Sequence, residues 1–174
     1  MEAEIIVPGT SPVPVLVGAL GQAMVRAAGE LADGVVTWLA GPRILEDRIV
    51  PDVAKAATEG GRGTPRIVVG LPVAVTDEGD AAREAAGVVF ARYAGLANYQ
   101  RVMARQGVAS PADVIVFGDE AEVERGLRRF ADAGVTEVWP VPFPVGDDPS
   151  ASLARTRRFL DQLCPIPVHQ EVRL

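Results

Sequence analysis

The sequence contains very few of the residues that carry nucleophile or metal chemistry. Cys164 is the only cysteine and His169 the only histidine among 174 residues. One cysteine cannot form an internal disulfide, and its place beside Pro165 near the end of the chain favours a small apolar role. His169 lies in a proline-flanked segment. We therefore assign neither residue a catalytic or metal-binding function.

Positive charge and long apolar runs are also lacking. The net charge is −6 and the isoelectric point about 4.8, which argues against general affinity for nucleic acids or anionic membranes. No apolar run of about 18 residues is present, and no basic leader followed by an apolar stretch precedes the first predicted strand. We expect neither a membrane span nor a secretory signal, and the expected location is the cytoplasm.

The stretch 12–42 predicts a strand, a tight turn, a helix and a second strand, and the rest of the chain repeats this order. Residues 13–17 form a nearly continuous aliphatic run, which is typical of a strand buried on both faces of a parallel sheet. Residues 23–32 carry apolar side chains at helical spacing, and Gly34 is predicted to end this helix in a left-handed conformation. Residues 35–38 give the second strand, so the stretch predicts a right-handed βαβ unit.

The turn between the first strand and its helix is a candidate anion site. Gly18 and Gly21 leave room for a sharp turn, after which four unpaired amides and the positive end of the helix dipole point into the crevice beyond the strand. The spacing is not the three-glycine dinucleotide fingerprint, and most such turns bind nothing. A purely structural turn therefore remains the alternative.

Two further strands are predicted at 66–75 and 136–141, and a short extra strand at 4–7 precedes the first unit. The order is strand then helix, repeated four times, which predicts an α/β fold with a parallel sheet. No composition change divides the chain, so we expect residues 1–174 to form a single domain.

The helices carry their own boundary signals. Pro51 interrupts an apolar helical pattern, which predicts two short helices or one kinked helix with Pro51 in the first turn of its second part. Asp119 and Glu122 have the spacing of a capping box, and Asn98 is predicted to cap a further helix.

An aromatic group at helical spacing allows two interpretations. Tyr93, Tyr99 and Met103 could face a ligand, but such spacing more often reflects core packing, and we interpret it as core.

Taken together, the sequence resembles a known family. The whole 12–42 stretch, with MVRAAGELADG followed by VVTW, resembles the fifth and sixth βα units of luciferase-like oxidoreductases, and is most similar to the branch that uses the deazaflavin coenzyme F420. RIVVGLPVAVTDEGDAAREAA, the 93–108 region and VFGDEAEVERGLRRFADAGVTEVWPVPF agree in the same register, so the resemblance covers nearly the entire chain. Gln22 departs from the family, which more often has proline there. The chain also begins at Met1, about halfway through the family's barrel.

The resemblance implies a fold and a cofactor. The fold is the C-terminal half of a TIM (β/α)8 barrel, about four βα units, because a complete barrel usually needs about 250 residues. The cofactor is F420, with FMN as the alternative, and the reaction is hydride transfer to or from a small organic substrate. The polar residues nearest the ring belong largely to the family's first half, so no catalytic residue is assigned. The implied cofactor-binding residues are Gly18, Ala19, Leu20, Gly21 and Gln22 at the phosphate-bearing chain, with Thr37 and Trp38 beside it.

Three readings of function stay open. The first is a partial oxidoreductase that is not competent without an N-terminal half. The second is a non-catalytic half-barrel that self-associates, since the sheet's apolar inner face and its edges would otherwise be exposed. The third is an unrelated flavodoxin-like domain with a nucleotide at the Gly18 turn. The expected partners are a small-molecule substrate and either further copies of the chain or the missing half.

Overall fold

The computed structural model describes residues 13–163, so the predicted strand at 4–7, Cys164 and His169 lie outside the described residues. The strands are β1 (Leu16–Gly18), β2 (Gly34–Trp38), β3 (Arg66–Val75), β4 (Val116–Gly118) and β5 (Glu137–Pro142). The helices are α1 (Gln22–Leu31), α2 (Pro42–Ile44), the π-helix η1 (Leu45–Ile49), α3 (Val50–Glu59), α4 (Gly79–Val89), α5 (Ala91–Ala94), α6 (Ala97–Gln106), the 3-10 helix η2 (Pro111–Val114), α7 (Glu120–Asp132) and α8 (Pro149–Leu163).

All the strand pairs are parallel, and β3 is the centre of the sheet. Val69 pairs with Thr37 of β2 and with Val138 of β5, so these two strands flank opposite edges of β3. The short β4 pairs with the last three residues of β3, beyond the end of β2. The main order β1-β2-β3-β5 is that of consecutive barrel strands, and the fold is half of a (β/α)8 barrel, as predicted.

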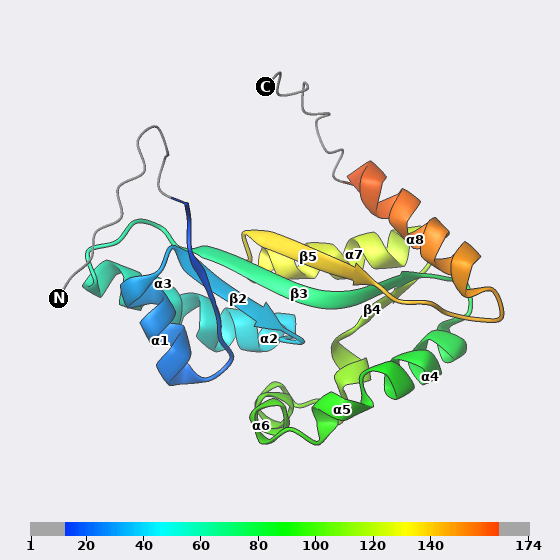
Figure 1. Ribbon diagram of the computed structural model, residues 1–174, viewed down its shortest axis with the longest axis horizontal. Helices are drawn as coiled ribbons and strands as arrows, with labels where there is room; N and C mark the ends of the chain where they lie inside the picture. Colours follow the sequence, from blue (N-terminus) through cyan, green and yellow to red (C-terminus); the bar gives the residue numbers. More distant parts are fainter. Residues whose placement is uncertain (1–12, 164–174) are drawn as a thin grey trace.

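The two faces of this sheet differ. One face packs its alternate residues against α1, α3, α7 and α8 in the main core. The other face, which we call the inner face, carries Val36, Trp38, Gly70, Trp139 and Val141. Figure 1 shows α4, α5 and α6, in green, as a separate arm that leaves the end of β3. The core residues on the packed face include Val35, Ile67, Val69, Leu71, Val73 and Val75.

Several helix boundaries are confirmed. The helical region from α2 to α3 is continuous through the π segment, and Pro51 lies in the first turn of α3. At α7, the Glu122 N–H donates to Asp119 Oδ1 (2.7 Å), and the Asp119 N–H donates to Glu122 Oε2 (3.0 Å). This reciprocal pair is the predicted capping box. None of the described helices is both long and apolar enough to cross a membrane.

Three local predictions are wrong. Val13 and Val15 are exposed and precede β1, which begins only at Leu16 and is an edge strand with no fully buried residue. Gly34 does not end a helix in a left-handed conformation; it begins β2, where a Cβ would lie 2.1 Å from the Arg66 carbonyl oxygen. Asn98 lies inside α6, whose N-cap is Leu96 with no side-chain capping bond.

Candidate functional site

A cavity of about 850 Å³ opens at the carboxyl ends of β1, β2 and β5, beside α5 and α6. In parallel α/β folds this is the face where active sites form. Six of the seven residues predicted to hold a cofactor line it: Gly18, Ala19, Leu20, Gly21, Thr37 and Trp38. The seventh, Gln22, lines an adjoining cavity.

The glycine turn presents fewer free amides than the sequence suggests. The Ala19 N–H is used by the sheet, since it donates to the Val36 carbonyl (2.9 Å). Gly21 is the N-cap of α1 with an ordinary extended φ of −85°, and no acidic side chain occupies the first turn of the helix. A Cβ at Gly18 or Gly21 would meet nothing within 4 Å, so the space in front of the turn is open. The donors left for an anion are those at the start of α1.

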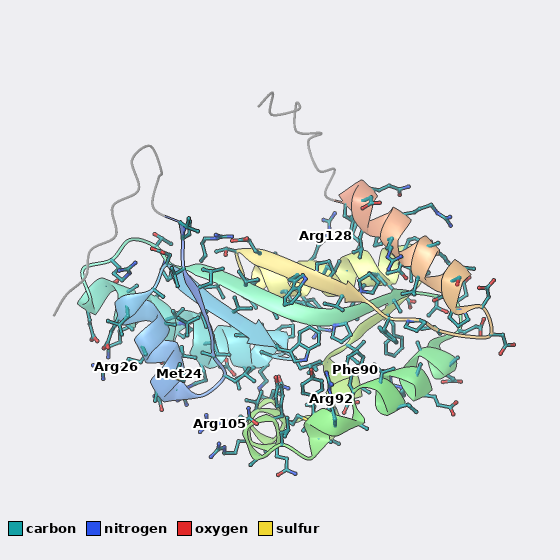
Figure 2. All side chains as sticks on the ribbon, viewed as in Figure 1. Met24, Arg26, Phe90, Arg92, Arg105 and Arg128 are labelled. Carbon is teal, nitrogen blue, oxygen red and sulfur yellow. The ribbon has the colours of Figure 1, made fainter. Side chains whose placement is uncertain are left out.

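A smaller cavity of about 270 Å³ extends the site between α1 and α6. Arg101 and Arg105 of α6 line it opposite Gly21 and Gln22. Neither guanidinium forms an ion pair with the side chains of residues 13–163. Figure 2 labels Arg105 on α6 and Met24 on α1, two residues that line this boundary. Two cations therefore lie beside the amino end of α1, where an anion is also favoured by the helix dipole.

Trp38 and Trp139 form an aromatic platform on the inner face. Both residues pair in register with Gly70, one from each side, and their ring centroids are 6.2 Å apart. A Cβ on residue 70 would come within 2.7 Å of Trp38 Cε3 and 3.1 Å of Trp139 Cε3. Gly70 is thus needed for the two indoles to approach each other over β3.

Helices α4 to α6 bring further rings to the same cavity. The ring of Trp38 lies 6.4 Å from that of Phe90 and 6.2 Å from that of Tyr93, and Tyr93 and Tyr99 meet edge to face at 4.9 Å. Tyr93 and Tyr99 pack against the second cluster of buried apolar residues, in line with their interpretation as core, and they also line the cavity, whereas Met103 is itself buried.

Two of the predicted residues play different parts. Thr37 is buried, and its hydroxyl donates toward the Val68 carbonyl at 3.4 Å, so Thr37 offers no free hydroxyl. The Trp38 indole Nε1–H is buried and has no hydrogen-bond partner among the described residues. Since an unpaired buried donor costs about 1–3 kcal/mol, this atom is suited to an acceptor on a bound molecule.

The cavity is electropositive and has little capacity for acid–base chemistry. Arg92 is the only charged residue in its lining, and its guanidinium lies 4.9 Å from the Tyr93 ring centroid and donates to the Tyr93 hydroxyl (3.0 Å). Burial, followed by the neighbouring Tyr93, raises the pKa of Tyr99, which therefore stays protonated as a donor. Among residues 13–163, no carboxylate or histidine lines the cavity.

The sequence matches the family described as luciferase-like monooxygenase over residues 3–147. The chain belongs to this family. It is 26% identical over 151 residues to an F420-dependent glucose-6-phosphate dehydrogenase of Nakamurella multipartita, a match covering 86% of this chain and 40% of that protein.

Solved structures of this family share the fold. The coenzyme F420-dependent tetrahydromethanopterin reductase of Methanopyrus kandleri matches with a TM-score of 0.65 and 24% identity, over 81% of this chain and 48% of that one. The FMN-bound oxygenating constituent of 3,6-diketocamphane monooxygenase of Pseudomonas putida matches with a TM-score of 0.61 and 19% identity, over 83% and 45%. This luciferase-like chain spans about half the length of these relatives.

Proposed function

We propose that this chain binds F420, or alternatively FMN, in the cavity at the carboxyl ends of β1, β2 and β5. One observation carries the proposal: a single continuous site joins an acid-free helix amino end to an aromatic chamber with an unpaired indole donor. Both cofactors combine a phosphate with a flat tricyclic ring, so this pairing of features suits them.

We place the phosphate of the cofactor between α1 and α6. The amides at the start of α1 supply fixed donors, and Arg101 and Arg105 add two cations that have no carboxylate partner among the described residues. Gln22, which replaces the family's more usual proline, retains an N–H at the first position of the helix. We therefore retain the phosphate site predicted from the sequence and add Arg101 and Arg105 to it.

We place the tricyclic ring of the cofactor beside Trp38. The Trp38 Nε1–H is available to a ring carbonyl, and Trp139, Phe90 and Tyr93 supply flat apolar surface around it. When bound, such a cofactor supplies the hydride chemistry itself, while the protein contributes orientation and exclusion of water.

The described residues supply binding rather than proton transfer, because the lining holds no carboxylate or histidine. The chain also spans only about half of its relatives. We therefore assign hydride transfer with a small organic substrate to an assembly that contains a second half of the site, and not to this chain alone.

The test is a fluorescence titration of the purified chain with F420, FMN and riboflavin, the last of which lacks the phosphate. We expect saturable binding of F420 or FMN, and riboflavin binding weaker by about tenfold or more because it lacks the charge-assisted hydrogen bonds. Absence of saturation with both phosphorylated compounds would refute the proposal. Equal affinity for riboflavin would refute the phosphate site.

A non-catalytic binding module is the second candidate, and it is favoured because the described residues that line the cavity include no carboxylate or histidine. The distinguishing measurement follows the absorbance of bound cofactor with a panel of alcohols and carbonyl compounds. Binding without any change of redox state supports the module, whereas substrate-dependent reduction or oxidation supports the enzyme.

A further inference from the structure

A second cavity, of about 660 Å³, lies on the packed side of the sheet, away from the aromatic platform. The start of α2, the end of α6, the 113–117 segment and α7 meet there. Its inner wall is apolar and includes Val114, Ile115 and Phe130. We call it the arginine pocket, after Arg43, Arg125 and Arg129, which line its outer wall.

The arginine pocket contains the other unpaired buried donor of the described chain. Gln106 is only 6% exposed, and its Oε1 accepts a hydrogen bond from the Gly41 N–H (2.8 Å). That bond determines which way the carboxamide points, because the opposite orientation would set two donors against each other. Gln106 Nε2 is then left with no acceptor among the described residues, and burying an unpaired donor costs about 1–3 kcal/mol.

Three arginines and two carboxylates line the pocket, and Arg43 is paired with Asp47 (3.6 Å), which lies outside the lining. The two carboxylates, Asp113 and Glu122, are both engaged with backbone amides. Asp113 Oδ2 accepts from the Ser110 N–H (2.9 Å), and Glu122 Oε2 accepts from the Asp119 N–H (3.0 Å). Arg125 and Arg129 have no carboxylate of residues 13–163 within 4.0 Å.

We infer that the arginine pocket binds a small organic anion, a carboxylate or phosphate monoester on a compact apolar body. The planar guanidinium groups suit either oxyanion, the apolar wall suits the body of the ligand, and Gln106 in the lining has an unpaired neutral donor, its Nε2–H. The site is separate from the proposed cofactor cavity, with which it shares no lining residue.

The two sites are nevertheless close along the chain. Trp38 lines the cofactor cavity, and Gly41, three residues later, lines the arginine pocket. An anion held against Gln106 would therefore stabilise the same loop that positions Trp38.

Calorimetric titration with phenyl phosphate and with benzoate tests the inference. We expect saturable binding of at least one probe by the wild-type chain, and a loss of tenfold or more in the double variant R125Q/R129Q. The matched control is R128Q, because Arg128 belongs to the same helix but pairs with Glu124 and lies outside the pocket. The control should bind within about twofold of wild type.

A further variant examines Gln106 itself. Gln106→Glu keeps an oxygen for the Gly41 N–H but replaces the donor by a second acceptor, so probe affinity should fall while the circular dichroism spectrum is unchanged. Absence of saturable binding up to about 10 mM of both probes would overturn the inference. So would equal losses in R128Q and R125Q/R129Q, because binding would then reflect only net charge. Each titration is independent of F420 and FMN, so its outcome does not depend on the cofactor proposal.

Discussion

At the scale of single residues, the loop after β2 carries an unusual conformation. Leu39 has a φ of +56°, the one positive φ among non-glycine residues of the described chain, and its side chain is buried. Left-handed backbone costs an L-residue about 1–2 kcal/mol. The strain is retained where Trp38 turns toward one cavity and Gly41 toward the other, as is common for backbone outliers near functional sites.

This strain makes a prediction about substitutions of Leu39. Both Leu39→Ala and Leu39→Gly remove buried apolar surface and should destabilise the chain by about 2–5 kcal/mol. Glycine adopts positive φ without strain, so Leu39→Gly should be the less destabilising of the two by roughly 1 kcal/mol, the reverse of the usual order. Urea unfolding monitored by circular dichroism measures the difference. A glycine variant less stable than the alanine variant would contradict strain at this position.

A second residue prediction concerns the glycine turn. Gly21→Val should leave the fold intact, since a Cβ at this position meets nothing within 4 Å and φ is −85°. The added side chain would occupy the space in front of the α1 amides and weaken F420 or FMN binding by about tenfold or more. Gly63→Val is the control, because Gly63 is equally open but lies outside the cavity. Unchanged affinity with an unchanged spectrum would remove the turn from the site.

At the scale of elements, the local spacing of apolar and capping residues predicted most strands and helices correctly. Strand β3 begins and ends where the aliphatic run does, and the α7 capping box forms as its sequence spacing indicates. These features depend on near neighbours in the chain. The position of α6 depends on contacts between residues far apart in the chain, so local pattern cannot place Arg101 or Arg105 against α1. Only their i,i+4 spacing, without an acidic residue nearby, can be read from the sequence. The use of the Ala19 amide by β2 was missed for the same reason.

Helix α8 packs Phe159 into the core and also forms a buried hydrogen bond to the sheet. Thr156 is fully buried, and its Oγ1 accepts from the Val75 N–H (2.9 Å) at the end of β3. Thr156→Val keeps the shape but leaves that amide unpaired, so we expect a loss of about 1–3 kcal/mol in unfolding free energy, or a thermal midpoint lower by about 2–4 °C per kcal/mol. Thr156→Ser keeps the acceptor and should cost less. A Thr156→Val variant as stable as wild type would show that this hydrogen bond does not contribute to stability.

An ion-pair cluster joins three elements and predicts a response to acid. Arg155 of α8 donates to Asp77 after β3 and to Glu120 at the start of α7, with N–O distances of 2.8 Å to each. Mainly through the hydrogen bond from Arg155, the pKa of Glu120 is lowered to about 2, and that of Asp77 is also lowered by this arginine. A lowered folded-state pKa contributes stability above the unfolded value of about 4.5, and this contribution is lost as pH falls toward 2.

The measurement is the thermal midpoint from pH 6 to pH 2.5 for wild type and Glu120→Gln. Wild type should lose stability over this interval, and the variant should show a shallower loss. The difference should be only a few °C, because the Glu120 side chain is 46% exposed and solvent screens the pair. Parallel curves for the two proteins would exclude Glu120 as a contributor to acid lability.

At the scale of the whole molecule, the open parts of the half-barrel are not equivalent. The Phe143 N–H donates to the Val73 carbonyl (3.2 Å), and strand alternation then directs the amides of Val141 and Trp139 toward β3 as well. Pro140 and Pro142 therefore face the open edge, where they supply no donor. At the opposite edge β1 has only three residues. Both edges therefore have features that limit pairing with another chain, and we expect assembly to involve the inner face instead.

The inner face leads to a prediction about assembly. Trp139 is 58% exposed there, beside Trp38 and the partly exposed Val36 and Val141, whereas the other face is covered by helices. An apolar surface of this kind is unusual on a monomer, so we expect the chain to be a dimer or larger in sedimentation equilibrium at micromolar concentration, joined through the inner face. Trp139→Asp should shift it toward monomer without changing the fold, because the side chain is largely solvent-exposed.

The control for this prediction is Leu31→Asp, which removes an even more exposed apolar side chain from α1 on the covered side of the sheet. It should leave the assembly unchanged. The alternative partner of the inner face is the N-terminal half of a barrel. It is tested by adding a separately produced N-terminal half from a relative. A stable one-to-one complex that replaces the dimer would show that the inner face binds barrel strands in preference to a second copy of this chain. A wild-type chain that sediments as a compact monomer of 18.3 kDa would contradict self-association, since the inner face would then be stable in water without any partner.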